Sequence, residues 1–145
     1  MADMGMLLAE AAEEVLENMF FSGVMGEMGD MEPDGERLCA TVTFAGSSVG
    51  ELSVSATPST IAVLAAGFLG AEDDTVPDAQ MRSVVGELAN VLCGAVLGHM
   101  NPKGSFVISP PEITEVGGAN SVCDMELHRR FELMEGDLAV GLTVH

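Results

Sequence analysis

The sequence predicts an α/β protein of the α+β kind, in which two long helices cover a single sheet of antiparallel hairpins. Two segments place apolar residues at helical spacing, and much of the remainder alternates apolar and polar residues in short runs. Turns that contain Gly, Ser or Pro separate many of those runs, as they do in hairpins. Because 145 residues with 48% hydrophobic content can fill one core without disulfides or metal, we expect a single domain over residues 1–145.

The first helix is predicted over residues 3–21. Leu8, Val15, Leu16 and Met19 fall on one face, and glutamates occupy most of the opposite face. An acidic turn over residues 26–36 is expected to lead from this helix into the first strand.

A hairpin and a short helix come next. We expect strands over residues 37–44 and 49–55, joined by a turn at residues 45–48. In the first strand Leu38, Ala40, Val42 and Phe44 would point inward. Thr57 followed by Pro58 is typical of a helix start, and the helix it begins should end at Gly70.

The central helix is predicted from Asp78 to about Asn101 and Pro102, with Thr75 as its cap. At about 100° per residue, one side collects a stripe of apolar residues, namely Met81, Val84, Val85, Leu88, Leu92 and Ala95. The other side collects Ser83, Glu87, Asn90 and Gly94. After Lys103 the pattern becomes β, with strands expected over residues 105–109, 113–116, 122–133 and 138–144.

Glu87 and Asn90 form the most informative pair in the chain. Asn is a mediocre helix former, so an Asn in mid-helix, between Gly86 and Gly94, is unfavourable there. Departures from local preference of this kind tend to mark functional sites. The alternative is that both residues are ordinary solvated positions on an amphipathic helix.

The run Ser83-x-x-x-Glu87-x-x-Asn90, followed by Pro110 and Pro111, resembles the signature of the chemotaxis phosphatases of the CheX, CheC and FliY type. Residues 86–94 resemble the central helix of that family, and residues 11–21 and 44–52 resemble its opening helix and first hairpin. The signature proline of the family lies a couple of residues farther from the Asn than it does here. Because a second Glu-x-x-Asn motif is absent, the chain is more similar to the single-site CheX type than to CheC.

This resemblance implies a CheC-like fold and hydrolysis of the aspartyl phosphate of a phosphorylated CheY-like response regulator. It assigns Asn90 to orient the attacking water and Glu87 to ion-pair with the regulator's active-site lysine. Ser83, Gly86 and Gly94 are expected to bind the partner, because residues of so little bulk allow close approach. No cofactor and no metal are expected in the chain itself, whereas Mg²⁺ is expected in the regulator.

The net charge of −18 excludes several kinds of partner. Free nucleic acid and anionic membranes are poor partners for such a surface. A phosphorylated metabolite is a poor substrate, because no Gly-rich phosphate loop with lysine is present and the central helix supplies only Arg82 as a cation. No apolar stretch reaches the length expected of a membrane-spanning helix. The three cysteines form no Cys-x-x-Cys pair, so a cytoplasmic protein is expected.

Two other functions remain open. A non-catalytic signalling module of the same fold could bind a response regulator or another signalling partner without hydrolysing anything. A metal-dependent enzyme is the weaker alternative, since no His, Asp and Glu cluster has ligand spacing. The Asp30-x-Glu32-x-Asp34-Gly35 run begins like a calcium loop, but Pro33 interrupts it and Thr41 stands where the bidentate Glu would be needed.

A homodimer is also expected. The CheX type forms dimers through its sheets, and the last predicted strand, residues 138–144, reaches almost to His145 with nothing after it to cover an edge. Strand residues from the C-terminal half should therefore lie at or near the contact.

Overall fold

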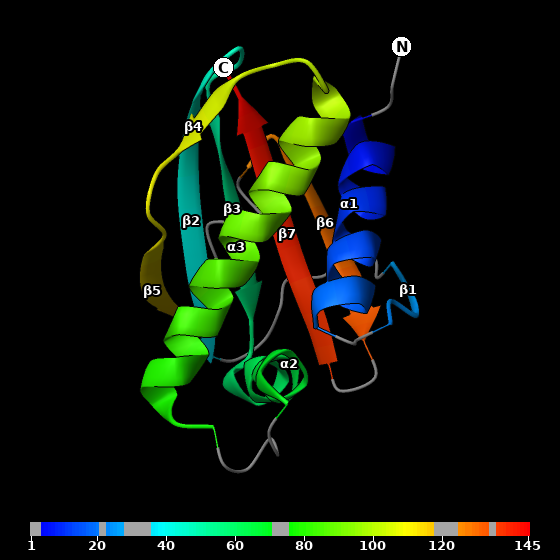
Figure 1. Ribbon diagram of the computed structural model, residues 1–145. Coiled ribbons are helices and arrows are strands. Elements are labelled where there is room, and N and C mark those ends of the chain that lie inside the picture. Colours follow the sequence, from blue (N-terminus) through cyan, green and yellow to red (C-terminus); the bar gives the residue numbers. More distant parts are fainter. Residues whose placement is uncertain (1–3, 21–22, 28–35, 71–75, 118–124, 134–135) are drawn as a thin grey trace.

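The computed structural model describes residues 4–20, 23–27, 36–70, 76–117, 125–133 and 136–145. Its strands form one sheet in which every pairing is antiparallel, and its helices lie against one face of that sheet (Figure 1). The predicted α+β fold is therefore confirmed. The helical layer is larger than expected, because the short helix Pro58–Leu69 packs in the same layer as the two long helices.

The helices are α1 (Met4–Met19), α2 (Pro58–Leu69) and α3 (Asp78–Met100). The strands are β1 (Gly26–Glu27), β2 (Glu36–Gly46), β3 (Gly50–Ala56), β4 (Phe106–Ile108), β5 (Glu112–Gly117), β6 (Leu127–Leu133) and β7 (Gly136–Val144). Most predicted elements match these bounds to within a few residues. β1 was not expected, because its two residues lie in the segment predicted as an acidic turn, of which residues 28–35 lie outside the described residues. β6 begins at Leu127 and leaves out residues 125 and 126 of the predicted strand, whereas residues 122–124 lie outside the described residues.

The strands follow the order β1-β6-β7-β3-β2-β4, and β5 pairs with β2 beyond the end of β4. The predicted hairpin is present as β2 and β3, with Phe44 opposite Gly50. The expectation that the last strand is an edge is wrong, because β7 is paired on both sides, with β3 and with β6. Strand order depends on pairings between distant segments, which local sequence patterns do not encode.

The core lies between the helices and the sheet face that they cover. Leu38, Ala40, Val42 and Phe44 of β2 are all buried there, which confirms the predicted alternation. The helices contribute long apolar side chains to the same core, among them Leu8, Leu16, Leu64, Leu88 and Leu92. α3 packs against α1, α2, β2 and β3, so it is the central element of the helical layer.

The caps of α2 are those that the sequence predicts. The Thr57 hydroxyl accepts a hydrogen bond from the Thr60 backbone N–H, Pro58 occupies the first turn, and Gly70 ends the helix at a φ of 69°. At the start of α3 the N-cap position is Pro77, with no side-chain cap, and Thr75 lies outside the described residues. The long helix is therefore placed by packing along its length.

By length and composition, α3 alone among the described helices could cross a membrane, which corrects the expectation that no apolar stretch is long enough. Half of its most apolar window is buried inside the fold. Its apolar character is therefore that of a core helix.

Candidate functional site

α3 has one buried face and one exposed ridge. Val84, Val85, Leu88 and Leu92 of the predicted stripe are buried, whereas Met81 and Ala95 are half-buried against the core. Ser83, Glu87 and Gly94 are exposed on the other side, and Asn90 is half-buried beside them. The two-sided character that the sequence predicts for this helix is thus confirmed.

Glu87 and Asn90 lie three residues apart, so their side chains emerge from adjacent turns on neighbouring faces of α3. Within the part of the chain that the structure describes, no side-chain hydrogen bond or ion pair engages either residue. A carboxylate and a carboxamide are therefore presented without internal partners. Such groups keep their hydrogen-bonding capacity for another molecule.

The expected surface position of Gly86 is wrong, because this glycine is buried. A Cβ at Gly86 would lie 3.0 Å from Cγ of Pro111 and 3.3 Å from Cδ1 of Ile113. The absence of a side chain therefore lets the segment that links β4 and β5 lie on the helix. Gly94 differs, because a Cβ there would have no heavy atom within 4 Å, and the space over it is open as expected.

This contact gives Pro111 a place beside the pair. Gly86 precedes Asn90 by four residues, so the two positions share one side of the helix. A helical side chain covers the turn that precedes its own Cα, so the Asn90 side chain extends toward the turn that contains Gly86. Pro111 packs on Gly86 and so borders the turn over which Asn90 extends. Ser109, two residues earlier, is anchored to β2 through hydrogen bonds with the backbone of Thr43.

On the opposite flank of the ridge, a hollow of about 280 Å³ separates α3 from the end of α2. We call it the α2–α3 groove, and its lining residues are Phe68, Leu69, Gln80, Ser83, Val84 and Glu87. Glu87 and Ser83 belong both to the ridge and to the groove. The contribution of α2 could not be predicted, since nothing in the sequence shows that Leu69 remains 45% exposed.

Arg82, near the start of α3, forms two ion pairs at the surface. Its Nε lies 3.4 Å from Oδ2 of Asp78, and its Nη2 donates to Oε1 of Glu115 on β5. Arg82 thus ties α3 to the edge of the sheet instead of pointing at a phosphate. In the described ranges, no three His, Cys, Asp or Glu side chains gather in a way that could hold a metal ion.

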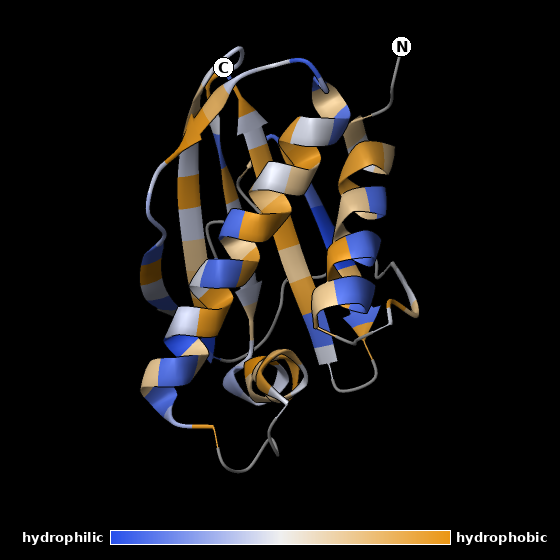
Figure 2. Cartoon of the chain, in the orientation of Figure 1, coloured by the Kyte–Doolittle hydropathy of each residue, from blue (hydrophilic) through white to orange (hydrophobic). Residues whose placement is uncertain are grey.

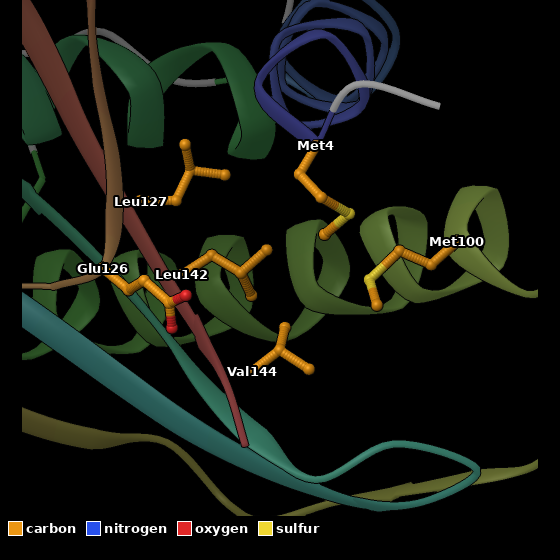
Figure 3. Close-up of a pocket in the computed structure, with 6 residues that line it drawn as sticks. All are labelled: Met4, Met100, Glu126, Leu127, Leu142 and Val144. Carbon is orange, nitrogen blue, oxygen red and sulfur yellow. The ribbon is translucent and has the colours of Figure 1, made fainter. Parts of the chain in front are cut away.

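A larger hollow, of about 380 Å³, lies at the other end of α3 (Figure 3). Its lining is apolar except for one carboxylate, and consists of Met4, Met100, Glu126, Leu127, Leu142 and Val144. Glu87 and Met100 are 13 positions apart on one helix, which amounts to roughly 20 Å. This hollow is therefore separate from the Glu87 and Asn90 ridge.

The fold is similar to those of several solved structures. The CheX chemotaxis protein of Vibrio vulnificus superposes with a TM-score of 0.78 at 14% identity, over 99% of this chain and 97% of that one. CheX of Borrelia burgdorferi, in a complex described as CheX-CheY-BeF3-Mg, gives 0.71 at 21% identity, over 99% and 98%. FliY of Thermotoga maritima gives 0.63 at 15% identity, over 97% and 87%. At such identities the likeness establishes the fold, which is that of CheX, CheC-like and FliY proteins.

The family follows from the sequence. A family model described as chemotaxis phosphatase CheX matches residues 38–127, which is more than half of the chain and includes the whole of α3. This protein belongs to the CheX family of chemotaxis phosphatases. No curated protein matches the chain in sequence.

Proposed function

We propose that this protein is a cytoplasmic phosphatase that hydrolyses the aspartyl phosphate of a phosphorylated CheY-like response regulator. The observation that carries the proposal is the Glu87 and Asn90 pair, presented without internal partners on the ridge of α3 in a member of the CheX family. The Borrelia burgdorferi relative, described as a complex with CheY, supports a regulator as the partner.

Asn90 is the residue that would hold the attacking water. Hydrolysis of an aspartyl phosphate requires water to approach phosphorus in line with the leaving carboxylate, and positioning contributes more than basicity in such loose transition states. A carboxamide oxygen accepts a hydrogen bond from water at any pH of interest. Asn90 is half-buried, beside the turn that Pro111 borders, and fewer side-chain conformations are open to it than to a fully exposed residue.

Glu87 would form an ion pair with the active-site lysine of the regulator. Its carboxylate is exposed one turn before Asn90, so an ion pair at Glu87 would fix where the neighbouring carboxamide enters the regulator's site. The ridge offers no cation of its own for the phosphoryl group, since Arg82 is engaged by Asp78 and Glu115. The lysine and Mg²⁺ of the regulator would supply the positive charge, and no cofactor of this chain is needed.

The direct test is the hydrolysis rate of a phosphorylated regulator from the same genome. Asn90→Ala should lower the rate by about 10²-fold, because a positioning group is lost while the fold and most of the docking surface remain. Asn18→Ala removes a carboxamide from the exposed face of α1 and should leave the rate unchanged. Phosphate release measured under single-turnover conditions separates this loss from weaker binding.

Glu87→Ala should weaken both docking and turnover, whereas Glu13→Ala removes an equal charge from the exposed face of α1 and should do neither. An Asn90→Ala protein as fast as the parent would refute the assignment of the water-holding role. If the parent protein binds an activated regulator but does not accelerate its dephosphorylation, the protein is a binding module with a phosphatase fold.

A further inference from the structure

The α2–α3 groove has an uncharged wall in a strongly acidic protein. None of the 12 residues of α2 is charged, although the chain as a whole carries a net charge of −18. Figure 2 shows α2 as a mostly apolar helix seen end-on beside the lower part of α3. Leu69, at the end of α2, leaves 45% of its surface in water.

Two of the residues that line the groove are packed against the core. The ring of Phe68 stacks on that of Phe20 with 4.9 Å between centroids, and Phe20 is itself 1% exposed. Val84 on the facing side of α3 is buried, and Gly70 ends α2 directly after Leu69. The apolar surface is thus formed before any partner arrives, so that little ordering would oppose binding.

The groove is also continuous with the proposed site. Ser83 and Glu87 line it from α3, which makes the Glu87 carboxylate the polar rim of an apolar hollow. A protein surface that places a lysine on Glu87 would bring the neighbours of that lysine over Leu69 and Phe68. An apolar floor with a charged rim is the usual arrangement of a small protein-binding pocket.

We propose that the α2–α3 groove receives an apolar side chain of the response regulator, one that lies beside the lysine bound by Glu87, and that Leu69 thereby determines which regulators are accepted. The proposal rests on the proposed function for the identity of the partner. Burying one large apolar side chain is worth about 10-fold to 100-fold in affinity. A regulator with a polar residue at that place would lose this contribution.

Other occupants fit the groove less well. A second copy of this chain would bring Glu87 and its other acidic residues toward an equally acidic surface, which opposes close contact. A phosphorylated small molecule would find only Gln80, Ser83 and a carboxylate among the polar lining residues. A partner that supplies a lysine beside an apolar side chain satisfies both parts of the site.

The test uses Leu69→Ser and Leu69→Lys in the full chain, with Met6→Ser as the matched control. Met6 is 61% exposed on α1, so this control removes another exposed apolar side chain far from the ridge. The probes are receiver domains of CheY-like regulators from the same genome, activated with beryllofluoride for binding and phosphorylated for turnover. Circular dichroism and thermal unfolding establish that each variant is folded.

Both Leu69 variants should raise Kd for the activated receiver domain and KM for its phosphorylated form by about 10-fold or more, with kcat within about twofold of the parent. In the parent, the methyl resonances of Leu69 should shift when the activated domain is added. If the parent is active, the Leu69 variants bind with the Kd of the parent, and the Leu69 methyl resonances of the parent do not shift, the proposed role of the groove is wrong. The roles of Asn90 and Glu87 would then stand.

The two proposals fail in different ways. If the parent protein binds the regulator with a Kd that depends on Leu69 but does not hydrolyse its aspartyl phosphate, the phosphatase assignment is wrong and the docking role of the groove stands. A parent that binds no regulator would overturn both. A fall in kcat at constant Kd would also overturn the groove, because Leu69 would then shape the chemistry instead of the docking.

Discussion

At the scale of single residues, the largest departure from expectation is a buried ion cluster on the face of the sheet that the helices leave uncovered. Arg37, predicted only as the first residue of a strand, is 1% exposed. Its Nη2 donates to Oδ2 of Asp137 at 2.9 Å and to the carbonyl oxygen of Ser55 at 2.9 Å. Arg130 donates to the same carboxylate oxygen of Asp137 at 2.9 Å.

This cluster could not be predicted from the sequence, since Arg37 and Asp137 are 100 positions apart and meet only through the sheet. β2 and β7 are not neighbours in the sheet, because β3 lies between them and supplies Ser55. The long guanidinium reaches across β3 and joins the two strands. The neighbouring Arg129 donates from Nη1 to the carbonyl oxygen of His128.

We predict that Asp137→Asn destabilises the protein by about 3–5 kcal/mol, because a buried Arg37 would lose its counter-charge. Burial raises the pKa of Asp137, but hydrogen bonds and charges from Arg130 and Arg37 outweigh it and hold the pKa below its ordinary value of 3.8. A depressed pKa stabilises the folded state above the ordinary value, and this stabilisation is lost as the pH falls through the folded-state pKa. The free energies of unfolding of parent and variant, measured in urea, should therefore show their full difference near neutral pH. This difference should shrink as the pH falls below about 4.

The control for this prediction is Asp78→Asn, which removes a carboxylate from an exposed ion pair with Arg82. Exposed pairs contribute little, so the expected loss is within about 1 kcal/mol. An Asp137→Asn protein as stable as the parent at neutral pH would show that Arg37 is accommodated without its counter-charge.

At the scale of the element, α3 was the most predictable part of the chain. Its bounds, its buried stripe and the exposure of Glu87 follow from 3.6-residue periodicity, which depends only on nearby residues. The neighbours on its two flanks, Pro111 and Leu69, could not be predicted because they come from elements whose packing the sequence does not encode. Gly86 was misplaced for the same reason: its angular position borders the ridge, and only the contact with Pro111 buries it.

The glycines of α3 give a matched pair of substitutions. Gly94→Ala should stabilise the protein by about 0.5–1 kcal/mol, because alanine favours the helix and the added Cβ meets nothing within 4 Å. Gly86→Ala carries the same helical gain but places its Cβ 3.0 Å from Pro111, and Gly86→Val would crowd that ring further. We expect no net gain for Gly86→Ala and a loss of about 1–3 kcal/mol for Gly86→Val.

Chemical denaturation of the three variants measures these differences. The phosphatase assay adds a second readout, since a shift of Pro111 should change the environment of Asn90. Equal stabilisation by alanine at both positions would mean that the β4–β5 link yields without resistance, and that Pro111 has no fixed place beside the ridge.

At the scale of the whole molecule, the order of the strands decides which edge is open. β7 is interior, so the edge that the sequence indicated does not exist. Among the described strands β5 pairs only with β2, which leaves its outer side without a strand neighbour. β5 belongs to the C-terminal half of the chain, so a dimer contact predicted in that half would use β5 instead of β7.

We predict a homodimer that pairs through the outer side of β5 and that salt strengthens. An unpaired edge favours association, but Glu112 is exposed on this strand and would repel its counterpart in a second copy, whereas Arg82 offsets the charge of Glu115. Repulsion between exposed charges falls as the screening length shortens from about 10 Å at about 0.1 M salt to about 3 Å at about 1 M. Light scattering should therefore report more dimer at the higher salt.

Glu112→Gln should favour the dimer at low salt, whereas Glu10→Gln, an equal charge change on α1, should have less effect. A monomer in every one of these conditions would remove β5 as an interface and leave its glutamates as residues that keep an open edge from pairing.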